Sequence, residues 1–503
     1  MLLILLQDCS GSRRTMSDPQ LLLLAVLLPF AGAIGIMLCG RWPDLREAVT
    51  LTTATTVCLV VINIYLRFLD GALLAVDIAE PLPGLSIRFE VESLGILFAL
   101  VASTLWLITS IYAIGYMRGH HELNQTRFYA LFAVAIGSTL GVAFAGNLLS
   151  LFLWYEILTI ATYPLVAHAG TDEARRGART YVGILLATSI VLLLLAILIT
   201  YTITGSLDFR EGGILAGKLD PAWAGLLYAL FIFGIGKAAV MPFHRWLPAA
   251  MVAPTPVSAL LHAVAVVKAG VFAVLKVTIY IFGTDFITSS GANDWLIWFA
   301  GGTILLASFV AMTKDNLKLR LAYSTISQLS YVVLGALLAT NTGLLGGALH
   351  ISMHAFAKIT LFFAAGAILV AANKSDVSDM GGLGRAMPIT FVAFLIGSLS
   401  IIGLPPFGGM WSKWYLGLGT VESGQWLLLS VLLISSLLNI AYLLPVPVRG
   451  FFGKTRDGTT YTRIKEAPLS CLIAMMITSL ACVLLFFYPD PFYELALNAA
   501  GGK

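Results

Sequence analysis

Long apolar stretches separated by short polar loops make up most of this chain. Fourteen of them reach about the 17–25 residues that a helix needs to cross a bilayer. The pattern therefore predicts an all-α polytopic membrane protein with about 14 transmembrane helices, numbered here as spans 1 to 14. They cover residues 20–39, 48–69, 93–117, 126–146, 148–168, 177–204, 222–248, 256–283, 294–312, 321–339, 343–372, 388–420, 425–448 and 468–488.

Composition excludes a soluble enzyme. Of 503 residues, 59% are hydrophobic and 11% are charged, whereas soluble domains carry about 25% charged residues. The longest loops are too short to bury a core of their own. The five cysteines are scattered without a CxxC spacing, so we expect neither a metal site nor a disulfide.

Basic residues set the expected orientation. If the loop after span 1 faces the cytoplasm, eighteen Lys and Arg lie in cytoplasmic loops and seven in outer segments. Because cytoplasmic loops are enriched in basic residues, this bias predicts a cell inner membrane protein with both termini outside. Residues 1–19 are either a short outer tail or, as Met16 suggests, the product of a misassigned start at Met1.

Two spans carry proline near the middle of the membrane. Pro242 interrupts span 7, and Pro405 and Pro406 interrupt span 12. Proline removes a backbone hydrogen bond, and broken backbone at this depth is tolerated only inside protein or beside a cavity. Two oppositely oriented broken helices indicate inverted repeats. We expect peripheral helices over 20–117, repeats over 126–283 and 294–448, and a loop and last helix over 449–503.

The spans also contain ionisable residues, each of which costs about 2.5–3.5 kcal/mol at the membrane centre. Glu156 is the only acidic residue that we place inside a span. Such residues by default mark an ion or proton path. The basic ones are Lys237, Lys268, Lys276, Lys358 and Lys413.

Glu156 is expected to neutralise Lys237, since it is the only buried carboxylate within reach of the break in span 7. A lysine that is desolvated in a bundle and paired with a movable carboxylate can take up and release a proton. The alternative is a static ion pair, although buried pairs are poor stabilisers. Lys276, near the end of span 8, is expected to snorkel to the interface.

Histidines add groups that titrate near neutral pH. His350, His354 and Lys358 are spaced four and four along span 11 and share one helix face. They form either a proton relay or hydrogen bonds to neighbouring helices. His262 lies close to Lys268 in span 8. Ser324, Gln328 and Tyr331 form a polar stripe on span 10 that either holds ordered water or joins helices.

No nucleotide-binding motif occurs in the chain. Energy must therefore come from an ion gradient or from a partner subunit, and we expect no cofactor. A haem-bearing quinone oxidoreductase component is a weaker alternative. His350 and His354 lie on one face of one helix, whereas a bis-histidine haem takes its ligands from facing helices.

The segment PFHRWLPAAMVAPTPVSALLHAVAVVKAG, supported by LLSLFLWYEILTIATYPLV and HAFAKITLFF, resembles the antiporter-like subunit family. This family is shared by Mrp-type monovalent cation/proton antiporters and the proton-pumping membrane arm of respiratory complex I. The resemblance covers at least spans 3–13. It implies 14 helices, two inverted five-helix repeats and broken helices 7 and 12.

The resemblance also implies roles for individual residues. The ending WSKWYL, and the absence of the aspartate found after PFHTWLP in complex I members, look more like the D-type Mrp subunit. The family's proton-transfer positions match Glu156, Lys237, His262, Lys268, His354, Lys358 and Lys413.

The expected function is therefore that of a proton-translocating subunit of a multisubunit Na⁺/proton antiporter, a secondary transporter rather than an enzyme. The alternative is a pumping subunit of a complex I-like oxidoreductase or a membrane hydrogenase. The expected partners are other membrane subunits, protons, Na⁺ and the lipid bilayer, with no nucleic acid.

Overall fold

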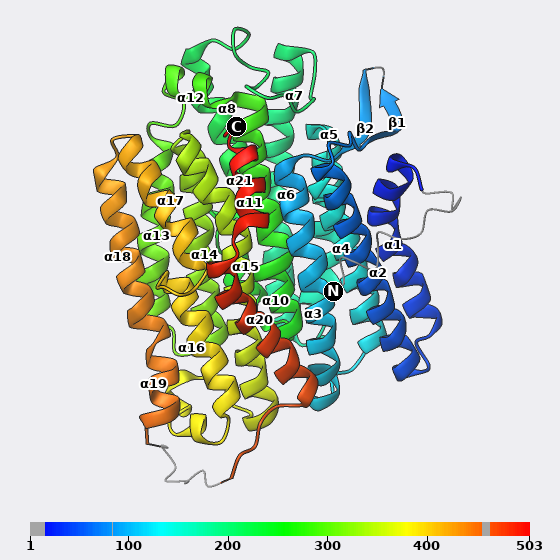
Figure 1. Ribbon diagram of the computed structural model, residues 1–503, viewed down its shortest axis with the longest axis vertical. Helices are drawn as coiled ribbons and strands as arrows, with labels where there is room; N and C mark the ends of the chain where they lie inside the picture. The colour runs from blue at the N-terminus through cyan, green and yellow to red at the C-terminus, as the bar shows by residue number, and fades with distance from the viewer. Residues whose placement is uncertain (1–15, 83, 455–462, 503) are drawn as a thin grey trace.

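The computed structural model describes residues 16–82, 84–454 and 463–502, in which long helices stand side by side (Figure 1). Within these residues, 11 helices are long and apolar enough to cross a membrane. Residues 1–15, on which the choice between Met1 and Met16 as the start depends, lie outside the described residues. The prediction of a helical polytopic membrane protein is confirmed.

The unbroken spans correspond to helices at the predicted positions. The first six are α1 (Asp18–Leu38), α2 (Pro43–Leu69), α3 (Ser93–Gly119), α4 (Gln125–Ala143), α5 (Leu148–Val166) and α6 with α7 (Asp172–Thr188 and Leu194–Thr204). The later ones are α10 with α11 (Thr255–Ala259 and Val266–Val277), α13 (Leu296–Thr313), α14 (Leu317–Leu337), α15 (Asn341–Ala372), α18 with α19 (Trp426–Leu443 and Pro445–Phe452) and α20 (Leu469–Phe487). Short helices α12 (Thr284–Ser290) and α21 (Asp490–Ala499) lie at one end of the bundle.

Spans 7 and 12 are both interrupted, as the prolines predict. Span 7 consists of α8 (Pro221–Gly234), a 3₁₀ turn (Gly236–Ala238) and α9 (Trp246–Ala249). Span 12 consists of α16 (Pro388–Ile402) and α17 (Gly409–Glu422). The break in span 7 begins before Pro242, because Ile235 leaves the helical region and Ala239 has a φ of 55°.

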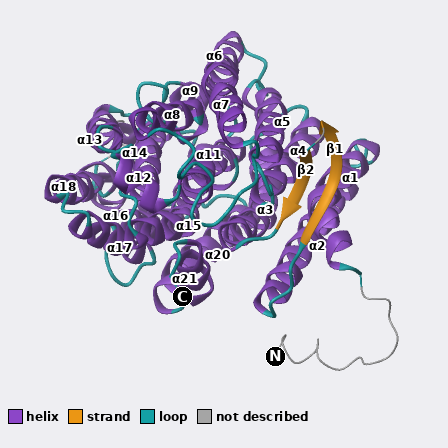
Figure 2. Cartoon of the chain, turned by 90° about the horizontal axis from the view of Figure 1, so that it is seen from above, coloured by secondary structure: helices purple, strands orange, loops and turns teal. Residues whose placement is uncertain are grey.

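A β-hairpin that the hydrophobic pattern does not predict covers part of one end of the bundle (Figure 1). Strands β1 (Ala75–Leu82) and β2 (Leu85–Glu90) pair antiparallel. Figure 2 shows the hairpin above α1 and α2, which stand at one side of the bundle. Its strands lie in a segment that we expected to be a loop, because they are too short and too mixed in polarity to register as a span.

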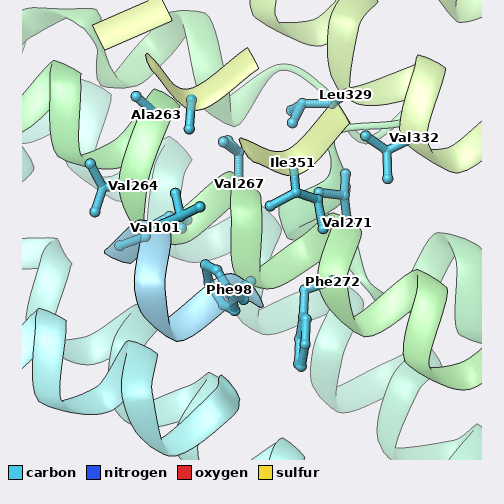
Figure 3. Packing of buried hydrophobic residues seen from close by; sticks show 14 of the residues in the cluster. Phe98, Val101, Ala263, Val264, Val267, Val271, Phe272, Leu329, Val332 and Ile351 are labelled. Carbon is cyan, nitrogen blue, oxygen red and sulfur yellow. The ribbon is translucent and has the colours of Figure 1, made fainter. Parts of the chain in front are cut away.

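Helix α11 lies near the middle of the bundle when it is seen from above (Figure 2). Every residue of α10 and α11 is buried. A helix that is apolar on all sides is stable only when it is surrounded. Figure 3 shows its apolar residues against the neighbouring helices, and the rings of Phe272 and Phe98 on α3 lie 5.0 Å apart. This packing carries Lys268 of α11 into the interior.

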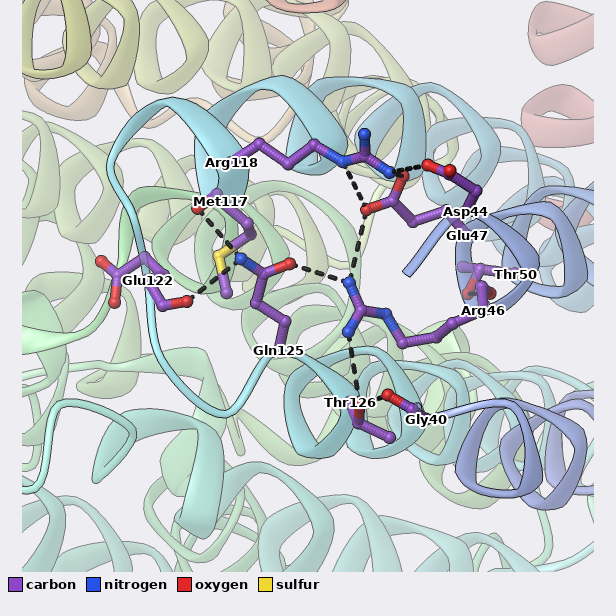
Figure 4. Close-up of polar contacts among 10 residues, drawn as sticks. All are labelled: Gly40, Asp44, Arg46, Glu47, Thr50, Met117, Arg118, Glu122, Gln125 and Thr126. Carbon is purple, nitrogen blue, oxygen red and sulfur yellow. Dashed lines mark hydrogen bonds and ion pairs between the residues drawn. The ribbon is translucent and has the colours of Figure 1, made fainter. Parts of the chain in front are cut away.

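Charged residues join α2, α3 and α4 at the end opposite the hairpin (Figure 4). The Arg118 guanidinium donates to both carboxylate oxygens of Glu47, at 3.0 and 2.6 Å. Arg46 donates to Gln125 at 2.8 Å. Glu47 lies near the start of α2, which begins at Pro43, and is only 5% exposed. Glu47 is thus a second carboxylate in the interior of the fold, whereas we expected it in the loop before span 2 and placed only Glu156 inside a span.

Candidate functional site

The turn that carries Lys237 is held between α6 and α11 by two glycines. A Cβ atom on Gly236 would lie 2.2 Å from Thr188 Oγ1, and one on Gly270 would lie 2.4 Å from the carbonyl carbon of Lys237. Both distances are too short for any side chain. Glycine at these positions therefore lets the broken backbone of span 7 pack inside the protein, as irregular backbone at membrane depth requires.

Lys237 is completely buried and binds α5 through its side chain. Its Nζ donates to the carbonyl oxygen of Tyr155 at 2.7 Å and to Thr159 Oγ1 at 2.6 Å. The same Nζ lies 3.1 Å from the centre of the Tyr155 ring, well inside the range of a cation–π contact. The backbone N–H of Lys237 donates to the Tyr155 hydroxyl at 3.1 Å.

Glu156 does not form the expected ion pair with Lys237. No ion pair within 4.0 Å joins the two in the described residues. Both Glu156 carboxylate oxygens are buried and have no hydrogen-bond partner there, and Glu156 follows directly on Tyr155, which contacts Lys237. The two residues are thus neighbours, with the lysine bound to neutral groups beside an unbound carboxylate.

Lys268 contacts a histidine from the facing helix. Its Nζ lies 2.7 Å from Nδ1 of His354 on α15. Two full positive charges at this distance repel by about 6 kcal/mol at an effective dielectric constant of about 20. The pair is therefore stable with at most one positive charge. The hydrogen bond between the two nitrogens offers a route for a proton.

From Lys268 and His354 a row of buried groups continues along α15 toward span 12. It runs through His350 and Tyr331 to Lys413. The rings of His354 and His350 stack with centres 5.6 Å apart, and His350 stacks on Tyr331 at 5.6 Å. His350 Nδ1 lies 2.8 Å from Ser412 Oγ, on α17. The Nε2 atoms of both histidines are buried without a hydrogen-bond partner among the described residues, and buried water commonly binds such groups.

Lys413 on α17 closes this row at the break of span 12. Its Nζ donates to the carbonyl oxygen of Ile402 at 3.1 Å and to Ser436 Oγ at 3.0 Å, and lies 5.0 Å from the Tyr331 ring. Ile402 is the last residue of α16. The carbonyl end of a helix carries partial negative charge, so it attracts an ammonium group.

Lys358, one turn beyond His354 on the same face of α15, forms a branch toward α14. It donates to Ser324 Oγ at 2.8 Å, and the Tyr442 hydroxyl donates to the same oxygen at 3.0 Å. Ser324 and Tyr331 from the polar stripe on α14 thus bind buried groups. Gln328 of that stripe is buried, and neither its amide nitrogen nor its oxygen has a hydrogen-bond partner in the described part of the chain.

His262 stands apart from this row. It lies in a π-helical segment, Leu260–Val264, and its ring centre is 4.8 Å from that of Phe362. Neither ring nitrogen has a hydrogen-bond partner in the residues that the structure describes. Over the same residues, no three or more His, Cys, Asp or Glu gather where a metal ion could bind.

Lys276 is buried rather than snorkelled. Its side chain is 1% exposed, and its Nζ lies 2.9 Å from Glu92 Oε1. It also donates to the Ala145 carbonyl and lies 4.3 Å from the Phe209 ring centre. Beside the lysine, Glu90 at the end of β2, Gly146 and Phe209 help to line a polar cavity of about 260 Å³. Burial raises the pKa of Glu92, just before α3, and Lys276 opposes that rise.

Tyr155 and Thr159 are the site residues that the sequence analysis missed. They lie one before and three after Glu156, so Thr159 shares a helix face with both Tyr155 and Glu156. That spacing could have identified Thr159 from the sequence. The backbone carbonyl of Tyr155 could not have been found from sequence, because every residue has one.

Comparisons with known proteins agree with this architecture. The family described as NADH:quinone oxidoreductase/Mrp antiporter, transmembrane, matches residues 145–439. The NADH-quinone oxidoreductase subunit N of Desulforudis audaxviator is 34% identical over 398 residues, 76% of this chain and 78% of that protein. A probable K(+)/H(+) antiporter component of Rhizobium meliloti is 32% identical over 404 residues, 78% of this chain but 39% of that protein.

A solved structure shares the fold. One chain in the structure of the Mrp complex from Dietzia sp. DQ12-45-1b superposes with a TM-score of 0.85. The superposition covers 96% of this chain and 97% of that chain, at 22% sequence identity. At this identity the likeness concerns the arrangement of helices.

Replacing Lys276 by Met should destabilise the protein, because it leaves Glu92 without its cationic partner. Removing one member of a buried pair typically costs about 3–5 kcal/mol, and the partial exposure of Glu92 places this site at the lower end. Lys276→Arg keeps the charge and should unfold close to the wild type. Thermal unfolding in detergent measures both. A wild-type melting temperature for Lys276→Met would show that the side chain is free to reach water.

Proposed function

The chain belongs to the NADH:quinone oxidoreductase/Mrp antiporter transmembrane family, and on that premise we propose that it translocates protons within a multisubunit monovalent cation/proton antiporter. The observation that carries the proposal is the Lys268–His354 contact of 2.7 Å, which lies between the two interrupted spans. From there the stacked rings of His354, His350 and Tyr331 reach toward Lys413.

In this proposal each interrupted span presents one lysine to the buried interior. Lys237 serves the repeat over 126–283 and Lys413 the repeat over 294–448, with Lys268, His354 and His350 between them and Lys358 as a branch. Glu156 acts on Lys237: when the carboxylate approaches, it holds the ammonium form, and when it withdraws, the proton is released. His262 acts on the neighbouring groups either electrostatically or through a bridging water molecule, since it has no direct hydrogen-bond partner among the described residues.

The same machinery would serve a second assembly. A complex I-like oxidoreductase is favoured by the similarity to a subunit N, of which the matched region covers 78%. The two assemblies differ in neighbouring subunits rather than in this chain. Identifying the membrane subunits that co-purify with it therefore distinguishes them.

We place the chain in the cell inner membrane with both termini outside. The support is the excess of basic residues at the end opposite the hairpin, such as Arg175, Arg176 and Arg179 in the first turns of α6. Na⁺ is the proposed counter-transported cation.

Glu156→Gln should abolish antiport without disrupting the bundle, because it keeps the shape of the side chain and removes its charge. The carboxylate has no hydrogen bond to lose within the described residues, so the folded state should retain its melting temperature. Antiport is measured in everted vesicles that contain the assembled complex. Activity near the wild-type level would rule out a role for Glu156 in switching Lys237.

Lys237→Met and Lys413→Met should each lower antiport at least tenfold, because each removes the proton-carrying group at a broken span. Lys218→Gln is the matched control: this lysine is exposed and donates to the Thr204 carbonyl at 3.0 Å, outside the buried row. We expect it to be neutral. The two-repeat proposal fails if either interior variant transports as well as the control.

The isolated chain should not perform complete, coupled antiport. Its interior row consists of lysines and histidines, which suit protons, whereas a dehydrated Na⁺ requires several oxygen ligands. A partner protein is expected to complete the cation route. Reconstitution of the single chain in liposomes tests this expectation. Robust Na⁺-driven proton movement without other subunits would contradict it.

A further inference from the structure

Lys237 has a complete set of partners that does not include a carboxylate. The carbonyl oxygen of Tyr155 and the hydroxyl of Thr159 accept hydrogen bonds from its Nζ at 2.7 and 2.6 Å. The ring of Tyr155 lies against the same nitrogen, with its centre 3.1 Å away. Tyr155 and Thr159 are fully buried, and both come from α5. Together they enclose the end of the lysine from two sides.

The tyrosine hydroxyl strengthens this arrangement. It accepts a hydrogen bond from the backbone N–H of Lys237 at 3.1 Å. One residue therefore fixes both ends of Lys237, the backbone through its hydroxyl and the ammonium through its ring and carbonyl. A chance contact on the surface of a helix would not hold both ends.

The unbound carboxylate lies beside this set. Glu156 follows Tyr155 directly and precedes Thr159 by three positions, so Glu156 and Thr159 are neighbours on the helix surface. Glu156 therefore presents a charged acceptor on the same helix that supplies both neutral partners of Lys237. The two partner sets compete for one ammonium group.

We propose that Tyr155 and Thr159 form a holding seat for Lys237, in which the lysine waits separated from Glu156 between transfers. The seat deepens the proposed function and rests on it. Lys237 alternates between the seat and Glu156, and the neutral seat keeps the lysine near the carboxylate without locking it into an ion pair. Tyr155 and Thr159 are positioning residues: they act on the proton only through Lys237.

Thr159 offers a test that separates its hydroxyl from its packing. Thr159→Val keeps the shape and removes the hydroxyl, whereas Thr159→Ser keeps the hydroxyl and loses a methyl group. We expect Thr159→Val to lower antiport about tenfold, as loss of one hydrogen bond to a charged group does, and Thr159→Ser to stay within about twofold of wild type. A packing role gives the opposite order.

The Tyr155 ring is tested in the same way. Tyr155→Phe keeps the ring and the carbonyl and should remain within about threefold of wild type, whereas Tyr155→Leu removes the ring and should lose at least tenfold. Thr162→Val is the matched control, because Thr162 is a buried threonine of α5 that binds Tyr181 at 2.6 Å rather than Lys237. We expect the control to transport normally.

All variants are measured in the assembled complex in everted vesicles, with Glu156→Gln in parallel and with melting temperatures recorded. If Glu156→Gln abolishes antiport while Thr159→Val and Tyr155→Leu match the control, the seat is wrong and the proposed function stands. If Glu156→Gln is itself fully active, the proposed function fails first. Equal losses in Thr159→Val and Thr159→Ser would also overturn the seat.

Discussion

The structure depends on how it binds four lysines of its interior without pairing them with carboxylates. Lys237, Lys268, Lys358 and Lys413 are bound by carbonyls, hydroxyls, an imidazole or aromatic rings. Such neutral partners stabilise a charge, but less than an opposite charge at the same distance does. A buried lysine held in this way can exist with or without its proton, whereas a tight buried ion pair strongly favours one state.

The broken helices follow from the same requirement. A continuous helix uses each interior carbonyl for its own hydrogen bonds, so it has few to offer a lysine. The end of α16 frees the Ile402 carbonyl for Lys413, and the turn after α8 directs Lys237 toward α5. Gly236 and Gly270 allow this turn to lie against two helices where any Cβ would collide. The interruptions therefore cost helix hydrogen bonds and supply binding geometry for buried charge.

Much of this arrangement could be predicted from the sequence. The hydrophobic pattern predicts the spans, and the prolines predict that two of them are broken. The four-residue spacing of His350, His354 and Lys358 predicts that they share one helix face. These features depend on local sequence. The β-hairpin was not predicted because its strands are short. The first break was placed too late because the helix ends before Pro242.

The partners of each buried group could not be predicted in this way. The expectation that Glu156 binds Lys237 rested on charge alone, and charge does not say that a tyrosine carbonyl and a threonine hydroxyl lie closer. Lys276 was expected at the interface because it lies near a helix end, but segments distant in sequence surround it and it is buried against Glu92. Both errors come from contacts between segments that are distant in sequence.

Proton translocation by the assembled complex with Lys268→Met tests the central claim most directly. Methionine keeps the approximate length of the side chain and removes the basic group that joins α11 to the histidines of α15. The account predicts that proton movement in proteoliposomes falls to background while the complex still assembles and unfolds at its usual temperature. A wild-type rate of proton movement from that complex would contradict the claim that protons pass along this row.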